Sequence, residues 1–139
     1  MPLKARKVDP EAILPTRAHA DDAGMDLYCL EDVSLSPQTG CVTRTGIALA
    51  IPQGHVGMVA DRSSMAKRGI KTAGGIIDAG YRGEIHVVLR NISGEAIEIK
   101  RGERIAQLLI IPIAIQAIEE VLELDDTARG VKGFGSSGR

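Results

Sequence analysis

An acid and an aromatic residue, Asp78 and Tyr81, stand three positions apart within a segment framed by glycines, Gly74-Gly75-Ile76-Ile77-Asp78-Ala79-Gly80-Tyr81-Arg82-Gly83. Glycines let the backbone bend sharply and let another molecule approach the main chain, because no Cβ stands in the way. We interpret the segment as a binding or reactive site. The alternative is an ordinary turn in which Asp78 only accepts hydrogen bonds from turn amides.

A second candidate begins at Asp61-Arg62, directly before the predicted short helix 63–69. A helix N-terminus offers unpaired amides and a partial positive charge, and an adjacent arginine with two hydroxyls would complete an anion site. A serine can cap the first turn, and Gly69 can close the helix in the left-handed conformation. The pattern indicates a phosphate cradle, with a simple capped turn beside a surface arginine as the alternative.

The C-terminal residues 125–139 combine glycines and serines with two cations, Arg129 and Lys132, and one ring, Phe134. The segment has too little apolar surface to fold by itself. A mobile stretch of this kind could close over a nucleotide, with its ring on the base and its other groups on phosphates. The alternative is a disordered tail.

Two polar side chains interrupt otherwise apolar predicted strands. Asp26 lies within 23–28, where a buried acid needs a partner, water or a nearby cation. Gln107 is the uncharged polar residue of 104–111, and its amide must find hydrogen bonds in the core or on a ligand.

The rest of the chain supplies short strands that would position these residues. Alternation of apolar and polar residues and intervening turn signals predict strands at 3–8, 23–28, 33–35, 41–51, 55–60, 76–77, 85–89, 96–99 and 104–111. We predict an edge strand at 3–8 and a hairpin connecting 76–77 to 85–89. Short strands at this spacing indicate an all-β sandwich or barrel. The apolar run continuing to Leu124 predicts a strand or extended arm at a subunit interface.

Length and composition limit the class of protein. The 139 residues fit one domain, with 18 acidic against 17 basic residues, so neither a polycationic nucleic-acid binder nor a membrane-surface protein is expected. No signal peptide or membrane span is apparent, and we expect a soluble, cytoplasmic protein. Cys29 and Cys41 lack CxxC spacing, which favours two unpaired thiols over a disulfide or a zinc site. The chain has one Phe, two Tyr and no Trp, so its core must be aliphatic.

Five segments, in order, resemble the five motifs of the trimeric dUTP diphosphatase family. They are 23–27 (AGMDL), 62–66 (RSSMA), 75–83 (GIIDAGYRG), 102–108 (GERIAQL) and 129–138 (RG through GFGSSG). The resemblance covers nearly the whole chain. It implies a jelly-roll β-sandwich at 1–124, a flexible closing arm at 125–139, and a homotrimer whose sites are shared between subunits. It also implies Mg²⁺-dependent hydrolysis of dUTP to dUMP and pyrophosphate, which removes dUTP and supplies dUMP for dTMP synthesis.

The resemblance also implies a role for each matching residue. Asp78 matches the acid that orients and deprotonates the water attacking the α-phosphorus, and Tyr81 matches the ring packed against deoxyribose, where a 2′-hydroxyl would collide. The part that reads the uracil edge, mainly through the main chain, matches Thr72, Gly75, Ile76, Ile77 and His86. Asp26 matches an acid that holds the metal through water. The phosphate-binding set of a neighbouring subunit matches Arg62, Ser63, Ser64 and Gln107. The closing arm matches Arg129, Phe134, Gly135, Ser136 and Ser137, with Phe134 over the uracil.

Two departures from the family pattern and two alternatives stay open. Thr72 stands where many bacterial members have Asn, and Lys132 replaces a residue that is commonly Gly and either contacts phosphate or stiffens the arm. A deoxycytidine triphosphate deaminase of the same fold would attack the base instead of the phosphate, but such enzymes are usually longer and lack the glycine-rich tail. A non-catalytic trimeric binding protein is the other alternative, and intact Asp78, Tyr81 and Gln107 argue against it.

Overall fold

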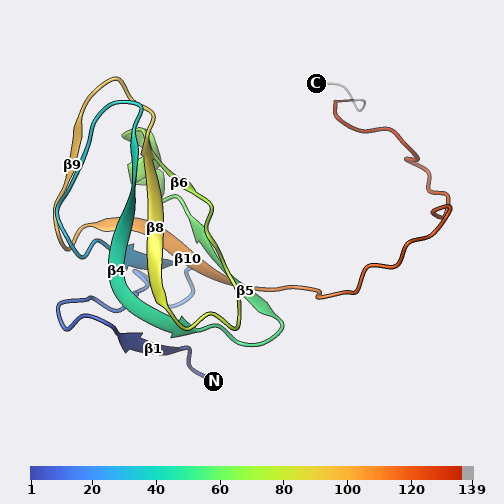
Figure 1. The fold of residues 1–139 in the computed structure, drawn as a ribbon, viewed down its shortest axis with the longest axis horizontal. Helices are drawn as coiled ribbons and strands as arrows, with labels where there is room; N and C mark the ends of the chain where they lie inside the picture. The colour runs from blue at the N-terminus through green and yellow to red at the C-terminus, as the bar shows by residue number, and fades with distance from the viewer. Residues whose placement is uncertain (136–139) are drawn as a thin grey trace.

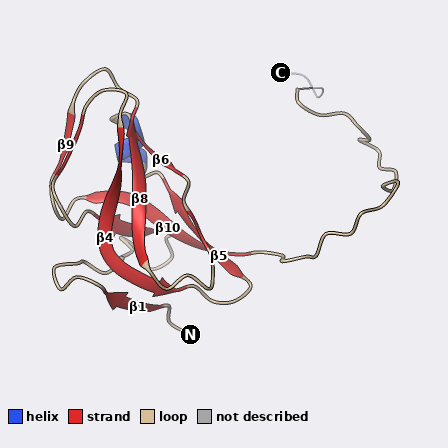
Figure 2. Cartoon of the chain, viewed as in Figure 1, coloured by secondary structure: helices blue, strands red, loops and turns tan. Residues whose placement is uncertain are grey.

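The computed structural model describes residues 1–135, and within them the chain is almost entirely β (Figures 1 and 2). The strands are β1 (Lys4–Lys7), β2 (Met25–Tyr28), β3 (Val33–Leu35), β4 (Gly40–Ala50), β5 (His55–Ala60), β6 (Ile70–Ala73), β7 (Ile76–Ile77), β8 (Glu84–Asn91), β9 (Ile97–Ile99) and β10 (Arg104–Pro112). The helix is α1 (Ser63–Lys67). These elements confirm the all-β fold class predicted from the sequence, with one short helix.

The strands form two four-stranded antiparallel sheets and a smaller two-stranded pair. One large sheet has the order β1-β4-β8-β6, the other has the order β2-β10-β5-β7, and β3 pairs with β9. The two large sheets enclose an aliphatic core that includes Leu27, Leu89, Ile105 and Leu108, each fully buried. Along β8 buried residues alternate with more exposed ones, because successive side chains of a strand point to opposite faces. The arrangement is a jelly-roll-like sandwich.

Several local predictions are confirmed. β1 pairs with β4 only, so the basic strand at the N-terminus is an edge strand. Gly69, just after α1, has a φ of +90°, the left-handed conformation expected at the end of the helix. Cys29 and Cys41 are both free thiols.

The predicted hairpin between 76–77 and 85–89 is wrong. β7 pairs with β5, whereas β8 pairs with β4 and β6 in the other large sheet. The glycine-framed segment is therefore a corner that carries the chain from one sheet to the other, and we call residues 74–83 the glycine corner. Apolar runs on both sides of a turn fit either arrangement, because Ile77 and Ile85 can face one core from two different sheets.

The predicted serine cap of the helix is also wrong. Arg62 occupies the N-cap position, with extended backbone and no side-chain hydrogen bond to the helix. Ser63 and Ser64 lie inside the first turn. A capping side chain must come from the residue before the first helical one, so neither hydroxyl is placed to cap.

Two segments were assigned incompletely from the sequence. β6 received no prediction, although Ile70-Lys71-Thr72-Ala73 forms a regular edge strand beside β8. After β10 ends at Pro112, residues 113–135 contain no helix or strand and extend away from the sandwich (Figure 1). Of the alternatives weighed for the run to Leu124, the extended arm is the one observed.

No helix in the described part of the chain is long and apolar enough to cross a membrane.

Candidate active site

The glycine corner borders a cavity of about 230 Å³. The lining residues are Ile76, Ile77, Asp78, Tyr81, Glu84, Ile85 and His86. Gly75 has a φ of +98°, and a Cβ there would lie 2.8 Å from the main-chain oxygen of Val59. Only glycine fits this position, and it lets the corner lie directly against β5. The structure thus brings together most of the residues predicted to bind base and sugar.

Asp78 is exposed at the edge of this cavity. Its main-chain oxygen accepts a hydrogen bond from the N–H of Tyr81 at 3.1 Å, which closes the turn. Among the described residues, its carboxylate has no hydrogen bond and no ion pair, so it does not serve the turn amides. The carboxylate is thus available to accept a proton from water.

Tyr81 is 44% exposed, and its hydroxyl donates to the main-chain oxygen of Glu84 at 2.7 Å. A Cβ at Gly83 would lie 2.6 Å from that hydroxyl, so the ring lies against the bare backbone of Gly83. His86 faces the same cavity with 45% of its side chain exposed. An ordered ring with one open face can pack against a ligand.

A second cluster of charged groups lies on strands β2 and β10, in the same sheet as β7. Asp26 of β2 accepts a hydrogen bond from Nε of Arg62 at 3.1 Å and lies 3.7 Å from Nε of Arg104. The Asp26 side chain is 17% exposed, and its two oxygens face different arginines. The buried acid therefore has the cationic partners that the sequence required of it.

Gln107 lies opposite Asp26 on the neighbouring strand β10. Its Nε2 donates to the main-chain oxygen of Asp61 at 2.8 Å, which fixes the plane of the amide. A Cβ at Gly24 would lie 2.1 Å from Oε1 of Gln107. The glycine before β2 therefore leaves the space that this amide occupies.

Thr72 of β6 is not among the residues that line the cavity at the glycine corner, and it is held in place by Asp61. Its N–H and its hydroxyl both donate to Oδ1 of Asp61, at 2.7 and 2.8 Å, and Lys71 pairs with Oδ2. Burial raises the pKa of Asp61, but the hydrogen bonds from Lys71 and Thr72 outweigh it, so the pKa lies below its ordinary value. Both donors of Thr72, the main-chain N–H and the hydroxyl, already bind Asp61, so neither is available to read a base.

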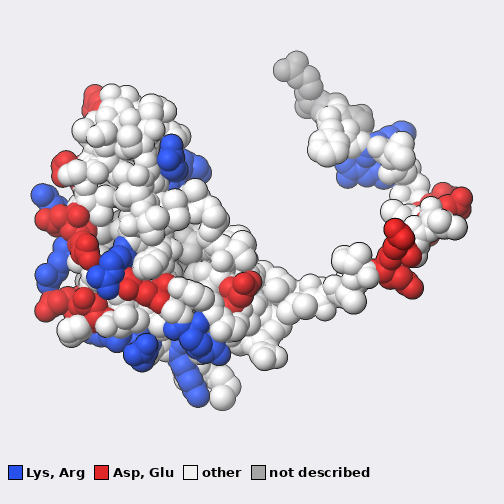
Figure 3. Space-filling model, viewed as in Figure 1, with Lys and Arg blue, Asp and Glu red and all other residues white. Residues whose placement is uncertain are grey.

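Ser63 and Ser64 are exposed at the start of α1. Ser64 borders a cavity of about 360 Å³ together with three arginines, Arg62, Arg68 and Arg104. The lining also includes Glu103, so the three arginines leave it with a net positive charge, which suits a polyanion. On the face that Figure 3 shows, basic and acidic side chains are interspersed over the lower part of the sandwich.

The glycine corner and the Asp26 cluster lie at different positions along the same sheet. Ile77, next to Asp78, pairs with Gly57, whereas Gln107 pairs with Ala60, three positions further along β5. Three positions of a strand span about 10 Å. Within the described residues of one chain, no hydrogen bond or ion pair joins the two groups.

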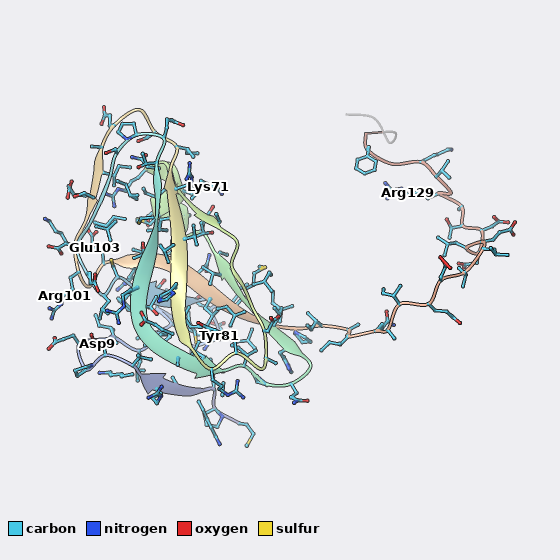
Figure 4. All side chains as sticks on the ribbon, in the orientation of Figure 1. Asp9, Lys71, Tyr81, Arg101, Glu103 and Arg129 are labelled. Atoms are coloured by element: carbon cyan, nitrogen blue, oxygen red, sulfur yellow. The ribbon has the colours of Figure 1, made fainter. Side chains whose placement is uncertain are left out.

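The described part of the C-terminal arm lies away from both groups. Figure 4 shows Arg129 on the extended arm, far from Tyr81 on the sandwich. Nε of Arg129 donates to the main-chain oxygen of Lys132 at 2.7 Å, and Phe134 is fully exposed. Gly135 has a φ of +93°. The predicted phosphate-binding residues Ser136 and Ser137 lie outside the described residues.

Sequence reasoning missed three residues that support these groups, Arg44, Glu84 and Arg104, and it named Asp61 only as the residue that precedes Arg62. Arg44 and Glu84 are 40 residues apart, and Asp61 and Thr72 are 11 apart. Arg44 and Arg104 lie inside the predicted strands 41–51 and 104–111, and they gave a signal because a charge within a strand needs a partner when it is buried.

Comparison with known proteins places the chain among dUTP-processing enzymes. The dUTPase family model matches residues 10–138. The deoxyuridine 5′-triphosphate nucleotidohydrolase of Corynebacterium glutamicum is 48% identical over 141 residues, covering 99% of this chain and 95% of the relative. That of Rhodococcus erythropolis is 46% identical over 137 residues, covering 96% and 84%.

Solved structures give the same result. The dUTPase of Staphylococcus bacteriophage 80alpha with dUpNHpp superimposes with a TM-score of 0.94 at 32% identity, covering 99% of both chains. A variant of the phage phi11 dUTPase, described as revealing the coordination of a structural Mg(II) ion, has a TM-score of 0.83 at 30% identity and covers 88% of this chain and 98% of that one. The sequence and the fold together show that this chain belongs to the dUTPase family.

Proposed function

We propose that this protein hydrolyses dUTP to dUMP and pyrophosphate, with Mg²⁺, as a homotrimer. Its relatives are named for dUTP hydrolysis, and its structural neighbour holds a dUTP analogue. The observation that carries the proposal is the exposed Asp78 carboxylate, which lacks a protein partner in the described chain and borders the cavity beneath Tyr81.

In the proposed reaction, Asp78 takes a proton from a water molecule as the water oxygen bonds to the α-phosphorus. The bond from that phosphorus to its bridging oxygen breaks, and pyrophosphate leaves. A carboxylate that has no ion pair keeps its lone pairs available for this proton. Tyr81 packs on the deoxyribose and excludes a 2′-hydroxyl.

Base recognition is assigned to the main chain of Gly75, Ile76 and Ile77, with His86 at the cavity wall. Main-chain groups hold their donors and acceptors in fixed places, which suits discrimination between uracil and cytosine. Phe134 closes over the base from the arm. Thr72 contributes by fixing β6, since its two donors already bind Asp61.

Phosphate binding is assigned to Arg62, Ser63, Ser64 and Gln107, joined by Arg129, Gly135, Ser136 and Ser137 of the arm. Arginine matches phosphate oxygens with a planar fork of donors. The second amide hydrogen of Gln107 stays available, because its Nε2 uses one hydrogen on Asp61.

The donor set fits a Mg²⁺ ion held through water. Among the described residues no group of three or more His, Cys, Asp or Glu could form a protein cage. Both oxygens of Asp26 face arginines, so this carboxylate suits a contact through a metal-bound water better than direct ligation. Mg²⁺ keeps its waters and binds phosphates readily. When bound, it neutralises phosphate charge during the reaction.

The geometry supports sites shared between subunits. Ile77, beside Asp78, and Gln107 of the phosphate-binding cluster pair with positions of β5 that are about 10 Å apart along the strand, which supports the assignment of the two groups of one chain to different sites. Residues 113–124, which lead from β10 to the closing arm, carry exposed apolar side chains, including Ile115, Ile118, Leu122 and Leu124. Such a surface is expected to be covered by another subunit. We therefore propose that one subunit supplies the glycine corner, a second the phosphate cradle and a third the arm.

The proposed product fits a role in supplying dUMP for dTMP synthesis and in removing dUTP, in the cytoplasm. The test is a pyrophosphate assay with each deoxynucleoside triphosphate, with and without Mg²⁺. We expect dUTP alone to be hydrolysed at a high rate, and only with Mg²⁺. Ammonia release from dCTP would instead identify a deaminase, and absence of pyrophosphate from dUTP would favour a binding protein.

A further inference from the structure

An ion pair ties Glu84, the residue that follows the glycine corner, to the neighbouring strand β4. Arg44 of β4 donates through Nε to Oε2 of Glu84 and through Nη2 to Oε1, both at 3.0 Å. The Glu84 side chain is 12% exposed, and that of Arg44 is 41% exposed. Two parallel bonds from a planar guanidinium fix both the distance and the orientation of a carboxylate.

Glu84 also fills an irregularity in the sheet. Arg44 of β4 pairs with His86 of β8, and the next pair is Ala48 with Glu84. Between these two pairs β4 advances by four residues and β8 by only two. Such a bulge leaves main-chain groups without ladder partners. The N–H of Gly46, a residue with a φ of +72°, donates to Oε2 of Glu84 at 3.1 Å. The carboxylate thus anchors the start of β8 to the bulge in β4.

Tyr81 depends on the peptide that this carboxylate anchors. Its hydroxyl binds the main-chain oxygen of Glu84, and its ring lies on Gly83, where no Cβ would fit. Inside the corner, Arg82 donates to the main-chain oxygens of Ala79 and Tyr81, at 2.6 and 3.1 Å, so local bonds hold the main chain. The hydroxyl end of the Tyr81 ring is instead fixed through Glu84.

We propose that Glu84, held by Arg44 and Gly46, is a positioning residue that fixes the Tyr81 ring and thereby sets discrimination between deoxyribose and ribose nucleotides. The inference rests on the proposed function, in which Tyr81 packs against deoxyribose. A ring that excludes one hydroxyl must be held within a fraction of an ångström, since a shift of about 1 Å is enough to change rates up to about 10²-fold.

The test compares kcat/KM for dUTP with kcat/KM for UTP. In Glu84→Gln the side chain keeps its size, but it cannot accept both Arg44 bonds and the Gly46 bond. We expect the dUTP to UTP ratio to fall about tenfold, the lower end of what one steric contact in a pocket contributes. Arg44→Lys keeps the positive charge but loses the planar guanidinium that binds both carboxylate oxygens, and we expect the dUTP to UTP ratio to fall in this variant too.

The matched control is Glu31→Gln. Glu31 is the other partner of Arg44, at 3.0 Å, with 59% of its side chain exposed. Glu31 makes no described contact with β8, so the dUTP to UTP ratio of Glu31→Gln should equal that of the wild type.

The ratio separates positioning from a loss of folded protein. A purely structural defect lowers both kcat/KM values in proportion, so an unchanged ratio in both Glu84→Gln and Arg44→Lys overturns the proposal. Tyr81→Phe removes the hydroxyl link, and adding Glu84→Gln to it should lower the ratio by less than about twofold, because the two changes break one connection. A further tenfold fall in the dUTP to UTP ratio, when Glu84→Gln is added to Tyr81→Phe, also overturns the proposal. Failure of the proposed function appears separately, as absence of wild-type dUTP hydrolysis.

Discussion

Replacing Gly24 with Ala should disable Gln107 without touching the substrate. Gly24 does not have a positive φ, so alanine fits its backbone conformation. The added Cβ would lie 2.1 Å from Oε1 of Gln107 and 3.1 Å from its Cβ. Real Cβ contacts essentially never fall below 3.0 Å, so the amide must move by at least 0.9 Å, the difference between 3.0 and 2.1 Å.

This displacement breaks the hydrogen bond from Nε2 of Gln107 to the main-chain oxygen of Asp61, now 2.8 Å long. We expect a loss of about 1 kcal/mol in the free energy of unfolding, the net worth of one hydrogen bond. The effect on activity should be larger. A misplacement of about 1 Å in Gln107, a group proposed to bind phosphate, should lower kcat/KM for dUTP by about 10- to 100-fold.

The assay is pyrophosphate release with purified Gly24→Ala, together with urea unfolding. Gly94→Ala is the matched control, since a Cβ at Gly94 meets nothing within 4 Å and its φ is not positive. Gly24→Ala should cause little further loss in a Gln107→Ala background, because both changes remove the same amide. A kcat/KM within twofold of the Gly94→Ala value would refute the reasoning.

Four other predictions follow from the site and its supports. Asp78→Asn should abolish turnover while dUTP binding, measured by calorimetry, stays near the wild-type level; an unchanged rate would rule out Asp78 as the base. Deleting residues 129–139 should cut turnover and leave the size on gel filtration at that of a trimer, whereas a smaller species would show that the arm holds the assembly together. The Arg44 hydrogen bond lowers the pKa of Glu84 below its ordinary value of 4.5, despite burial; the stability that this pair contributes should be fully present above pH 4.5 and be lost as the pH falls through the lower folded-state pKa. Urea unfolding at several pH values should show this loss in the wild type and less of it in Arg44→Met. Equal slopes of the unfolding free energy against pH in the two proteins would contradict the assignment of the stability to the Arg44–Glu84 pair. Thr72→Val should destabilise the fold by about 1 kcal/mol, because one of the two bonds to Oδ1 of Asp61 is lost and the N–H bond stays; no change in urea midpoint would show that this hydroxyl bond contributes nothing.

Local patterns in the sequence were sufficient for much of the architecture. Alternating apolar residues predicted β5 at its observed bounds and most other strands to within a few residues. Gly69 was recognised as a helix terminator because its conformation is a property of the residue itself. The five ordered segments identified the family, since they preserve the residue types that its chemistry needs.

Pairing between distant strands was decided only by the tertiary structure. The sequence placed a turn at residues 74–83, but its two flanking strands belong to different sheets, and that choice depends on β4 and β5, which lie earlier in the chain. The same holds for the charged supports. Glu84 meets Arg44 across 40 residues, and Asp26 meets Arg62 across 36.

The local backbone conformation and the set of reactive groups could therefore be predicted, because both depend on residue type and nearest neighbours. Which of these groups meet depends on the packing of the sheets. Asp78 is left without a partner in the described chain, and Asp26 is enclosed by two arginines. Two similar aspartates in apolar surroundings acquire different environments because the packing of the sheets, and not their own flanking residues, brings the arginines to only one of them.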